Sequence, residues 1–217
     1  MTSMRLNTEQ IGALDKRYRA LFINALSGFK SANLIATCDN RKNTNLAIFT
    51  SVFHIGSSPP LLGMISRPHS VPRHTLENIL QTGHYTINHV NESIIKQAHQ
   101  TSARYDEEIS EFQATGLSEQ WDDDFPAPFV EQSRIQLGMK LRENHQLAIN
   151  STVMIIGEIT HINIKDDVVH QDGYVDIERA GSIATSSLDS YHRTELLSHL
   201  RYAKPEKLPE QITDRKK

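Results

Sequence analysis

Residues 45–75 read N-L-A-I-F-T-S-V-F-H-I-G-S-S-P-P-L-L-G-M-I-S-R-P-H-S-V-P-R-H-T, and the fold prediction starts from this stretch. It holds two apolar runs, Leu46–Ile55 and Leu61–Ser66, which are rich in the β-branched and aromatic residues typical of strands. The G-S-S-P-P between them predicts a turn, because proline cannot donate a hydrogen bond to a sheet and fixes its own φ. The stretch therefore predicts two strands joined by a turn.

A helix is predicted directly after these strands. Thr75 is the expected N-cap, and Gly83 is the expected end of the helix. Between them, Leu76, Ile79 and Leu80 lie on one face at helical spacing.

Two arginines and two hydroxyls are expected beside the N-terminus of that helix: Ser66, Arg67, Arg73 and Thr75. A helix N-terminus carries free N–H groups and a partial positive charge, and the planar guanidinium of arginine fits phosphate oxygens. Charge and spacing alone nevertheless favour a simpler interpretation, in which two surface arginines flank a structural N-cap.

Four short segments with fixed spacing resemble a known family. They are N-L-A-I-F-T at 45–50, S-P-P-L at 58–61, R-H-T-L-E-N-I at 73–79 and T-G-H-Y-T-I-N at 82–88. Together they resemble the flavin reductase-like, FMN-binding split-barrel family. E-F-Q-A-T-G-L-S at 111–118 is similar to a further segment of that family, which has an acidic residue and Phe followed by Gly-Leu.

The resemblance implies a fold, a cofactor and an assembly. The fold is mainly β with peripheral helices, a six-stranded antiparallel Greek-key split β-barrel. The cofactor is FMN, with FAD less favoured, and it lies at the interface of a homodimer. Ring and ribityl contacts are implied first for Asn45, Thr50 and Ser51, and the phosphate site for Arg73 and Thr75. The whole predicted cofactor site is Asn45, Leu46, Ala47, Ile48, Phe49, Thr50, Ser51, Ser66, Arg67, Arg73, His74, Thr75 and Asn78.

Apolar periodicity predicts the remaining strands and one long helix. The helix runs over Leu14–Leu26, after a loose arm at residues 1–13. The clearest alternation is in Ser133–Arg142, where every second residue is apolar. Further strands are expected over Ala32–Cys38, His84–Val90 and Val153–Ile164, the last with a bulge at Gly157, and on both sides of an Asp-Gly turn at Val168–His170 and Tyr174–Ile177.

Residues 91–132 are expected to form an insertion of helices and loops. One helix begins at Asn91 or Ser93, and a second covers Asp106–Ala114. The acidic W-D-D-D-F-P-A-P that follows is expected to be irregular because it contains two prolines. Glu195–Leu200 is compatible with a helical turn. The predicted organisation is an arm and helix over 1–30, a barrel domain over 31–203 and a tail over 204–217.

Composition excludes several classes of protein. The chain has 217 residues and a net charge of -3 with both signs mixed, so it lacks the basic patch of a nucleic-acid binder. Its single cysteine, Cys38, excludes a disulfide framework and a cysteine-based zinc site. No apolar run approaches the ~20 residues of a membrane helix, and the first ten residues lack a signal-peptide core. A soluble, cytoplasmic protein is expected, without nucleic-acid or membrane partners.

The sequence predicts neither a metal site nor a catalytic acid, base or nucleophile. The 11 histidines include no H-E-x-x-H or His-x-His motif, and His84 and His89 point to opposite faces of their predicted strand. His54 follows the predicted flavin strand, but a structural or exposed role is favoured for it. Neither G-x-S-x-G nor G-x-G-x-x-G occurs, so a hydrolase elbow and a Rossmann nucleotide site are not predicted.

The function implied by the resemblance is that of an NAD(P)H:flavin oxidoreductase, in which NAD(P)H is a transient co-substrate that passes a hydride directly to the flavin. Two alternatives remain open: a flavin-binding electron carrier without NAD(P)H turnover, and a split-barrel protein that binds no flavin. The sequence departs from the family near its end. Tyr191 is kept, but Thr185, Ser187 and Leu188 stand where many members have the Arg and glycines of R-x-G-G, and Gly138 stands where many have Cys.

Overall fold

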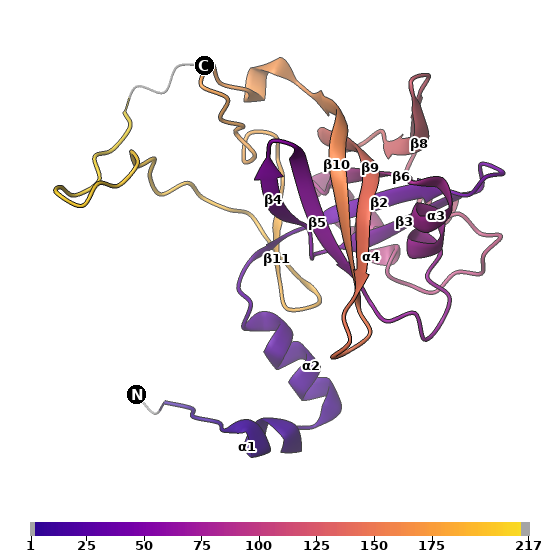
Figure 1. The fold of residues 1–217 in the computed structure, drawn as a ribbon, viewed down its shortest axis with the longest axis horizontal. Coiled ribbons are helices and arrows are strands. Elements are labelled where there is room, and N and C mark those ends of the chain that lie inside the picture. The colour runs from indigo at the N-terminus through magenta and orange to yellow at the C-terminus, as the bar shows by residue number, and fades with distance from the viewer. Residues whose placement is uncertain (1–2, 214–217) are drawn as a thin grey trace.

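The computed structural model describes residues 3–213. The first two residues of the expected N-terminal arm and the last four of the expected tail lie outside this range. The described chain forms a curved antiparallel sheet with short helices around it (Figure 1). None of its helices is long and apolar enough to cross a membrane.

Two helices at the N-terminus lie apart from the sheet: α1 (Thr8–Ala13) and α2 (Lys16–Ala25) (Figure 1). The expected loose arm is therefore wrong over its second half. There, the Asn7 side chain accepts from the Gln10 N–H while the Gln10 side chain accepts from the Asn7 N–H, which is a capping box. The expected helix over 14–26 is confirmed with shorter bounds, because Asp15 is its N-cap.

Seven strands form the main sheet, in the order β3-β2-β6-β9-β10-β5-β4, and all neighbouring pairs are antiparallel. The mainly β architecture with peripheral helices is confirmed. The strands are β2 (Asn33–Cys38), β3 (Thr44–Phe49), β4 (Phe53–Ser57), β5 (Pro60–Ser66), β6 (His84–His89), β9 (Ile135–Gln146) and β10 (Val153–Ile164).

The strand count differs from the expected six because the run Leu46–Ile55 is two strands. The break falls at Thr50–Val52, where the chain passes from β3 at one edge of the sheet to β4 at the other. Ser51 is fixed inside the break, since its Oγ donates to the Ile65 carbonyl oxygen at 3.0 Å and accepts from the Ile65 N–H at 3.1 Å. The apolar run has no glycine or proline at this break, because tertiary contacts and not a local turn sequence direct the chain from β3 to β4.

The sheet is buried on both faces. Leu34 and Leu46 pack with Phe112 in one cluster, whereas Ile35 and Tyr85 pack in another with residues of β5, β9, β10 and the helix α3 (His74–Thr82). The expected bulge at Gly157 is confirmed by a shift in the register between β9 and β10. A Cβ at Gly157 would overlap the Tyr85 hydroxyl, so only glycine lets that ring lie across β10.

The region between β6 and β9 contains more regular structure than expected. After η1 (Glu92–Ile94) come α4 (Ile95–Gln100) and α5 (Glu111–Thr115), so the second expected helix is shorter and starts later. The acidic segment expected to be irregular forms a hairpin of β7 (Glu119–Asp122) and β8 (Phe125–Val130). Its two prolines are tolerated because this hairpin is a separate two-stranded sheet.

The C-terminal third contains η2 (Asp166–Val168) and a small sheet of order β1-β11-β12, made of β1 (Lys30–Ser31), β11 (Ala184–Ser186) and β12 (Ser190–His192). The expected pairing around the Asp-Gly turn is confirmed by a single bridge between Val169 and Val175. The helical turn considered for Glu195–Leu200 does not form. Residues 193–213 are mostly exposed and contain no helix, and the chain folds back on itself at the bridge between Leu200 and Gln211 (Figure 1).

Candidate functional site

The N-terminus of α3 lies beside the start of β3. The helix begins at His74 with Arg73 as the N-cap, and no side chain caps it. The expectation that Thr75 is the N-cap is wrong: the Glu77 carboxylate accepts from the Arg73 N–H at 2.9 Å, which starts the helix earlier. Thr75 instead lies in the first turn, buried, where its Oγ1 accepts from the Asn45 amide at 2.9 Å. This bond joins the two segments that the sequence assigned to ring and phosphate contacts.

Three arginines gather at this helix end: Arg67, Arg73 and Arg104, here called the arginine cluster. None of them forms an ion pair with a carboxylate of residues 3–213. Burial lowers the pKa of Arg73, and the like charges of Arg67 and Arg104 lower it further. A group of cations without a counterion, next to an uncapped helix N-terminus, suits a phosphate.

The outer side of β3 is the second part of the site. In the β2–β3 ladder Leu46 pairs with Ala36, and the Leu46 N–H points away from β2. It donates instead to the Glu111 Oε2 at 2.8 Å. Backbone groups alternate along a strand, so those of Ile48 lie on the same free edge. A flat cofactor can therefore meet unpaired backbone groups at Ile48 and beyond, but not the occupied N–H of Leu46.

The predicted residues do not all offer their side chains to a ligand. Leu46 is fully buried in the core, and Phe49 packs against the second apolar cluster. Ser51 bonds both backbone groups of Ile65. Asn78 donates to the Thr37 Oγ1 at 3.1 Å, which holds α3 on β2. The other predicted residues lie on β3 or just after it, at the end of β5, or around the start of α3. They are Asn45, Ala47, Ile48 and Thr50 for β3, Ser66 and Arg67 for β5, and Arg73, His74 and Thr75 for α3.

Two residues of this site were not among the predicted ones. Arg104 lies in the loop after α4, where no motif marks it and only tertiary structure brings it near Arg73. Glu111 had a signal, because it is the acidic residue of the E-F-Q-A-T-G-L-S segment. That segment starts α5, whose first turn contacts β3.

Glu111 is a buried carboxylate that holds the edge of β3. It is 7% exposed, and burial raises its pKa although the hydrogen bond from Leu46, its own N–H and the nearby His74 oppose this. Thr44 supports the same contact, since its Oγ1 lies 2.7 Å from the Ser110 Oγ and donates to Glu119 at 2.6 Å.

The effect of replacing Glu111 on stability should therefore depend on whether the new side chain can still accept the hydrogen bond from the Leu46 N–H. We expect Glu111→Leu to reduce the free energy of unfolding by about 1–2 kcal/mol, because the Leu46 N–H loses its partner. Glu111→Gln keeps an acceptor oxygen and removes a buried charge, so it should be close to the wild type. Urea unfolding at neutral pH measures both. Equal losses for the two variants would contradict the assigned hydrogen bond.

No metal site emerges from the described part of the chain, which contains no group of three His, Cys, Asp or Glu side chains able to hold an ion. His54 lies on β4, an exposed edge strand. Cys38 is buried at the end of β2, and burial raises the pKa of its thiol.

Solved structures with this fold come from several bacteria. A chain from Shewanella frigidimarina, described as a flavin reductase with a split barrel domain, is 55% identical with a TM-score of 0.90, covering 93% of this chain and all (100%) of that one. Nitrilotriacetate monooxygenase component B from Bacillus cereus is 14% identical with a TM-score of 0.79, covering 90% and 98%. An FMN-binding protein from Thermus thermophilus is 14% identical with a TM-score of 0.66, covering 89% and 96%. The last two likenesses concern the fold alone.

The family comparison agrees with the resemblance seen in the four motifs. The model of the flavin reductase like domain matches residues 26–180, which includes β1 to β10, α3 and the whole candidate site. The mainly β, split-barrel architecture expected from the sequence is thereby confirmed. This chain belongs to the flavin reductase like domain family.

Proposed function

We propose that this protein is an FMN-dependent NAD(P)H:flavin oxidoreductase. Membership of the flavin reductase like family supports a flavin cofactor. The observation that carries the choice of FMN is the arginine cluster at the uncapped start of α3, beside the free edge of β3. Arg67 and Arg73 bind the phosphate, with Arg104 adding charge, and the backbone from Ile48 to Ser51 contacts the ring.

In this proposal the chain binds and orients rather than transferring protons. Bound FMN supplies a ring that accepts a hydride from the nicotinamide. The Asn45–Thr75 hydrogen bond fixes the distance between the phosphate end and the ring end of the site. Glu111 keeps β3 straight by occupying the Leu46 N–H, so the neighbouring free groups stay available. NAD(P)H enters and leaves as a co-substrate, in a cytoplasmic protein.

The test combines a spectrum with a turnover assay. The purified protein, or the protein supplied with FMN, should show bound-flavin absorption near ~450 nm, a property of the cofactor. It should oxidise NADH or NADPH in the presence of FMN in steady state. Absence of flavin binding would contradict the cofactor assignment, and binding without oxidation of either nucleotide would contradict the reductase.

A flavin-binding electron carrier is the second candidate, favoured by the departures near the C-terminus. Thr185 is buried in β11 and donates to the Lys30 carbonyl oxygen, so it lacks the reach of the arginine found in many members. Ser187, which stands near a family glycine, keeps a positive φ of 54°. This chain therefore has a turn of the kind glycine favours but lacks the positive charge there. Flavin binding with no NAD(P)H oxidation would favour this candidate.

We also propose a homodimer with flavin at the interface. No residue of α2 is buried, and four large apolar side chains on it or just after it are exposed: Tyr18 is 47% exposed, Ile23 45%, Leu26 66% and Phe29 70%. Their number within twelve residues supports a protein contact here, because exposed apolar residues that gather in one place are typical of interfaces.

Sedimentation at micromolar concentration should therefore show a dimer. The double variant Leu26→Glu, Phe29→Glu is expected to raise the dimer dissociation constant by tenfold or more, about 1.4 kcal/mol. Leu208→Glu is the control, since Leu208 is also exposed but lies in the C-terminal segment. A wild-type monomer that binds FMN tightly would contradict the shared site.

A further inference from the structure

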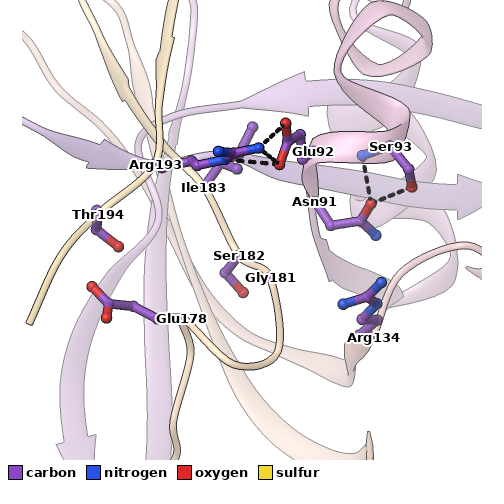
Figure 2. Close-up of a pocket in the computed structure, with 10 residues that line it drawn as sticks. All are labelled: Asn91, Glu92, Ser93, Arg134, Glu178, Gly181, Ser182, Ile183, Arg193 and Thr194. Atoms are coloured by element: carbon purple, nitrogen blue, oxygen red, sulfur yellow. Dashed lines mark hydrogen bonds and ion pairs between the residues drawn. The ribbon is translucent and has the colours of Figure 1, made fainter.

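A pocket of about 590 Å³ is formed by residues other than those of the candidate flavin site, and Figure 2 shows its lining. Its walls come from the turn after β6, the first residues before β9, the loop before β11 and the segment after β12. None of the predicted cofactor-binding residues lines it. The volume is within the range of small-molecule sites. The lining residues are Asn91, Glu92, Ser93, Arg134, Glu178, Gly181, Ser182, Ile183, Arg193 and Thr194.

The pocket contains four charged side chains, and two of them neutralise each other. Arg193 holds Glu92 in a two-pronged ion pair, with nitrogen-to-oxygen distances of 2.5, 2.7 and 2.9 Å. This pair joins the segment after β12 to η1, and each of its two charges is neutralised by the other. It leaves Arg134 and Glu178 as the charges available to a ligand.

Arg134 has no hydrogen bond or ion pair to any residue between 3 and 213, although it projects into the pocket (Figure 2). Its position is nevertheless fixed from one side. A Cβ on Gly181 would lie 3.0 Å from the Arg134 Nη1, so the guanidinium packs directly over the glycine backbone. Gly181 has a φ of +78°, which other residues rarely adopt. The guanidinium is thus presented with its donors unused.

Glu178 stands on the other side of the loop formed by Gly181 and Ser182 (Figure 2). Its Oε2 accepts from the Leu196 N–H at 3.1 Å, while the Oε1 accepts from no described residue. One oxygen therefore anchors the carboxylate to the backbone, and the other remains open to a donor. Arg134 and Glu178 therefore line the same pocket with opposite charges, and neither is paired with another charged side chain of residues 3–213.

The floor between these two charges is rigid. Asn91 and Ser182 form a backbone bridge, and the Asn91 amide donates to the Gln132 carbonyl oxygen at 2.7 Å. The Ser182 Oγ lies 2.9 Å from the Nδ1 of His89, which anchors the hydroxyl to β6. These bonds tie the backbone just before Arg134, at Gln132, to the loop that follows Glu178, at Ser182. The two segments that carry the charges are therefore joined before a ligand binds, which lowers the ordering cost of binding.

We propose that this pocket binds a small zwitterion, an amino acid or related amino carboxylate. The carboxylate of the ligand lies on the Arg134 guanidinium in a forked contact, and its ammonium group donates to the Glu178 Oε1. The site is independent of the flavin site, so occupation of one does not require the other.

Titration calorimetry with the full-length protein tests the proposal, using glycine, 4-aminobutyrate and 6-aminohexanoate as zwitterions of increasing length. At least one should bind saturably in the millimolar range or tighter. Arg134→Gln and Glu178→Gln should each weaken that binding by about tenfold or more. An analogue of the zwitterion that binds, lacking either its amine or its carboxylate, should bind more weakly by a similar factor. Gly181→Ala, which displaces the guanidinium, should also weaken binding.

Two controls separate this site from general effects. Arg179→Gln removes an exposed arginine that pairs with Asp167 outside the pocket, and it should leave zwitterion binding unchanged. FMN binding should be unchanged in Arg134→Gln, which also reports correct folding of the variant. The proposal is overturned if none of the three zwitterions binds the wild type at concentrations up to about 50 mM. It is also overturned if Arg134→Gln binds the zwitterion as tightly as the wild type does.

Discussion

Replacing Arg73 with alanine is expected to weaken FMN binding by about 1.5–3 kcal/mol, or about 10- to 150-fold, the range for a hydrogen bond to a charged group. Arg73 is half-buried beside two like charges, so in the proposed site the phosphate of FMN would supply the counterion that this cluster lacks. Among residues 3–213, its own side chain makes only one hydrogen bond, a long one from the Nε to the Pro68 carbonyl oxygen at 3.4 Å. The variant should therefore fold normally while binding FMN less well.

Riboflavin distinguishes the phosphate contact from a general change in the site. It has the same ring but no phosphate, so its affinity should change little in Arg73→Ala. Arg41→Ala serves as the matched variant, because Arg41 is exposed in the turn between β2 and β3. Fluorescence titration of both ligands against the wild type and the two variants gives six dissociation constants. If FMN and riboflavin lose affinity equally, Arg73 does not contact the phosphate.

The second large effect is a loss of stability in acid caused by His89. Burial lowers the pKa of His89 from 6.5 to about 4. The unfolded chain therefore binds a proton at this residue as the pH falls below about 6.5, whereas the folded chain does so only near pH 4. Folding is favoured above this window, and the stability is lost progressively as the pH drops through it, to a total of about 3 kcal/mol.

Comparison with His89→Asn isolates this contribution from the titration of the carboxylates. Asparagine can still reach the Ser182 hydroxyl, but it does not titrate. The stability difference between pH 7 and pH 4, measured by urea unfolding, should be smaller in the variant by about 3 kcal/mol. His145→Asn, which changes an exposed histidine beside Glu143, should behave as the wild type. Identical pH profiles for wild type and His89→Asn would refute the assignment.

Local sequence patterns were sufficient to predict the central strands of the sheet. The alternation of Ile135, Leu137, Met139 and Leu141 predicted β9, and Gly157 marked the bulge of β10. The spacing of Leu76, Ile79 and Leu80 and the stop at Gly83 predicted the helix α3 beside the candidate phosphate site. These features depend on the period of the side chains and on glycine conformation, both of which are local properties.

Other features depend on contacts between distant parts of the chain. The break at Thr50–Val52 interrupts an apolar run without glycine or proline, because Ser51 is held by Ile65 of β5. The prolines of β8 argued against a strand, but the Pro128 carbonyl oxygen accepts from Thr86 of β6, so the hairpin is held from outside. Arg104 joins the arginine cluster only through the folding of the segment after α4. The helix α1 is different, since the Asn7 and Gln10 pattern was a local signal that could have found it.

The three residues between β3 and β4 also constrain the speed of folding. Consecutive Cα atoms are 3.8 Å apart, so the end of β3 and the start of β4 lie within roughly 15 Å, although they belong to opposite edges of the sheet. The interior pairings that close this ring are distant in sequence: Ser66 of β5 pairs with Val153 of β10, and Asn88 of β6 with Gln136 of β9. Long loops must close before these contacts form, which slows the search. Refolding of this chain is therefore expected on the scale of milliseconds to seconds, with the arrival of β10 between β5 and β9 as the late event.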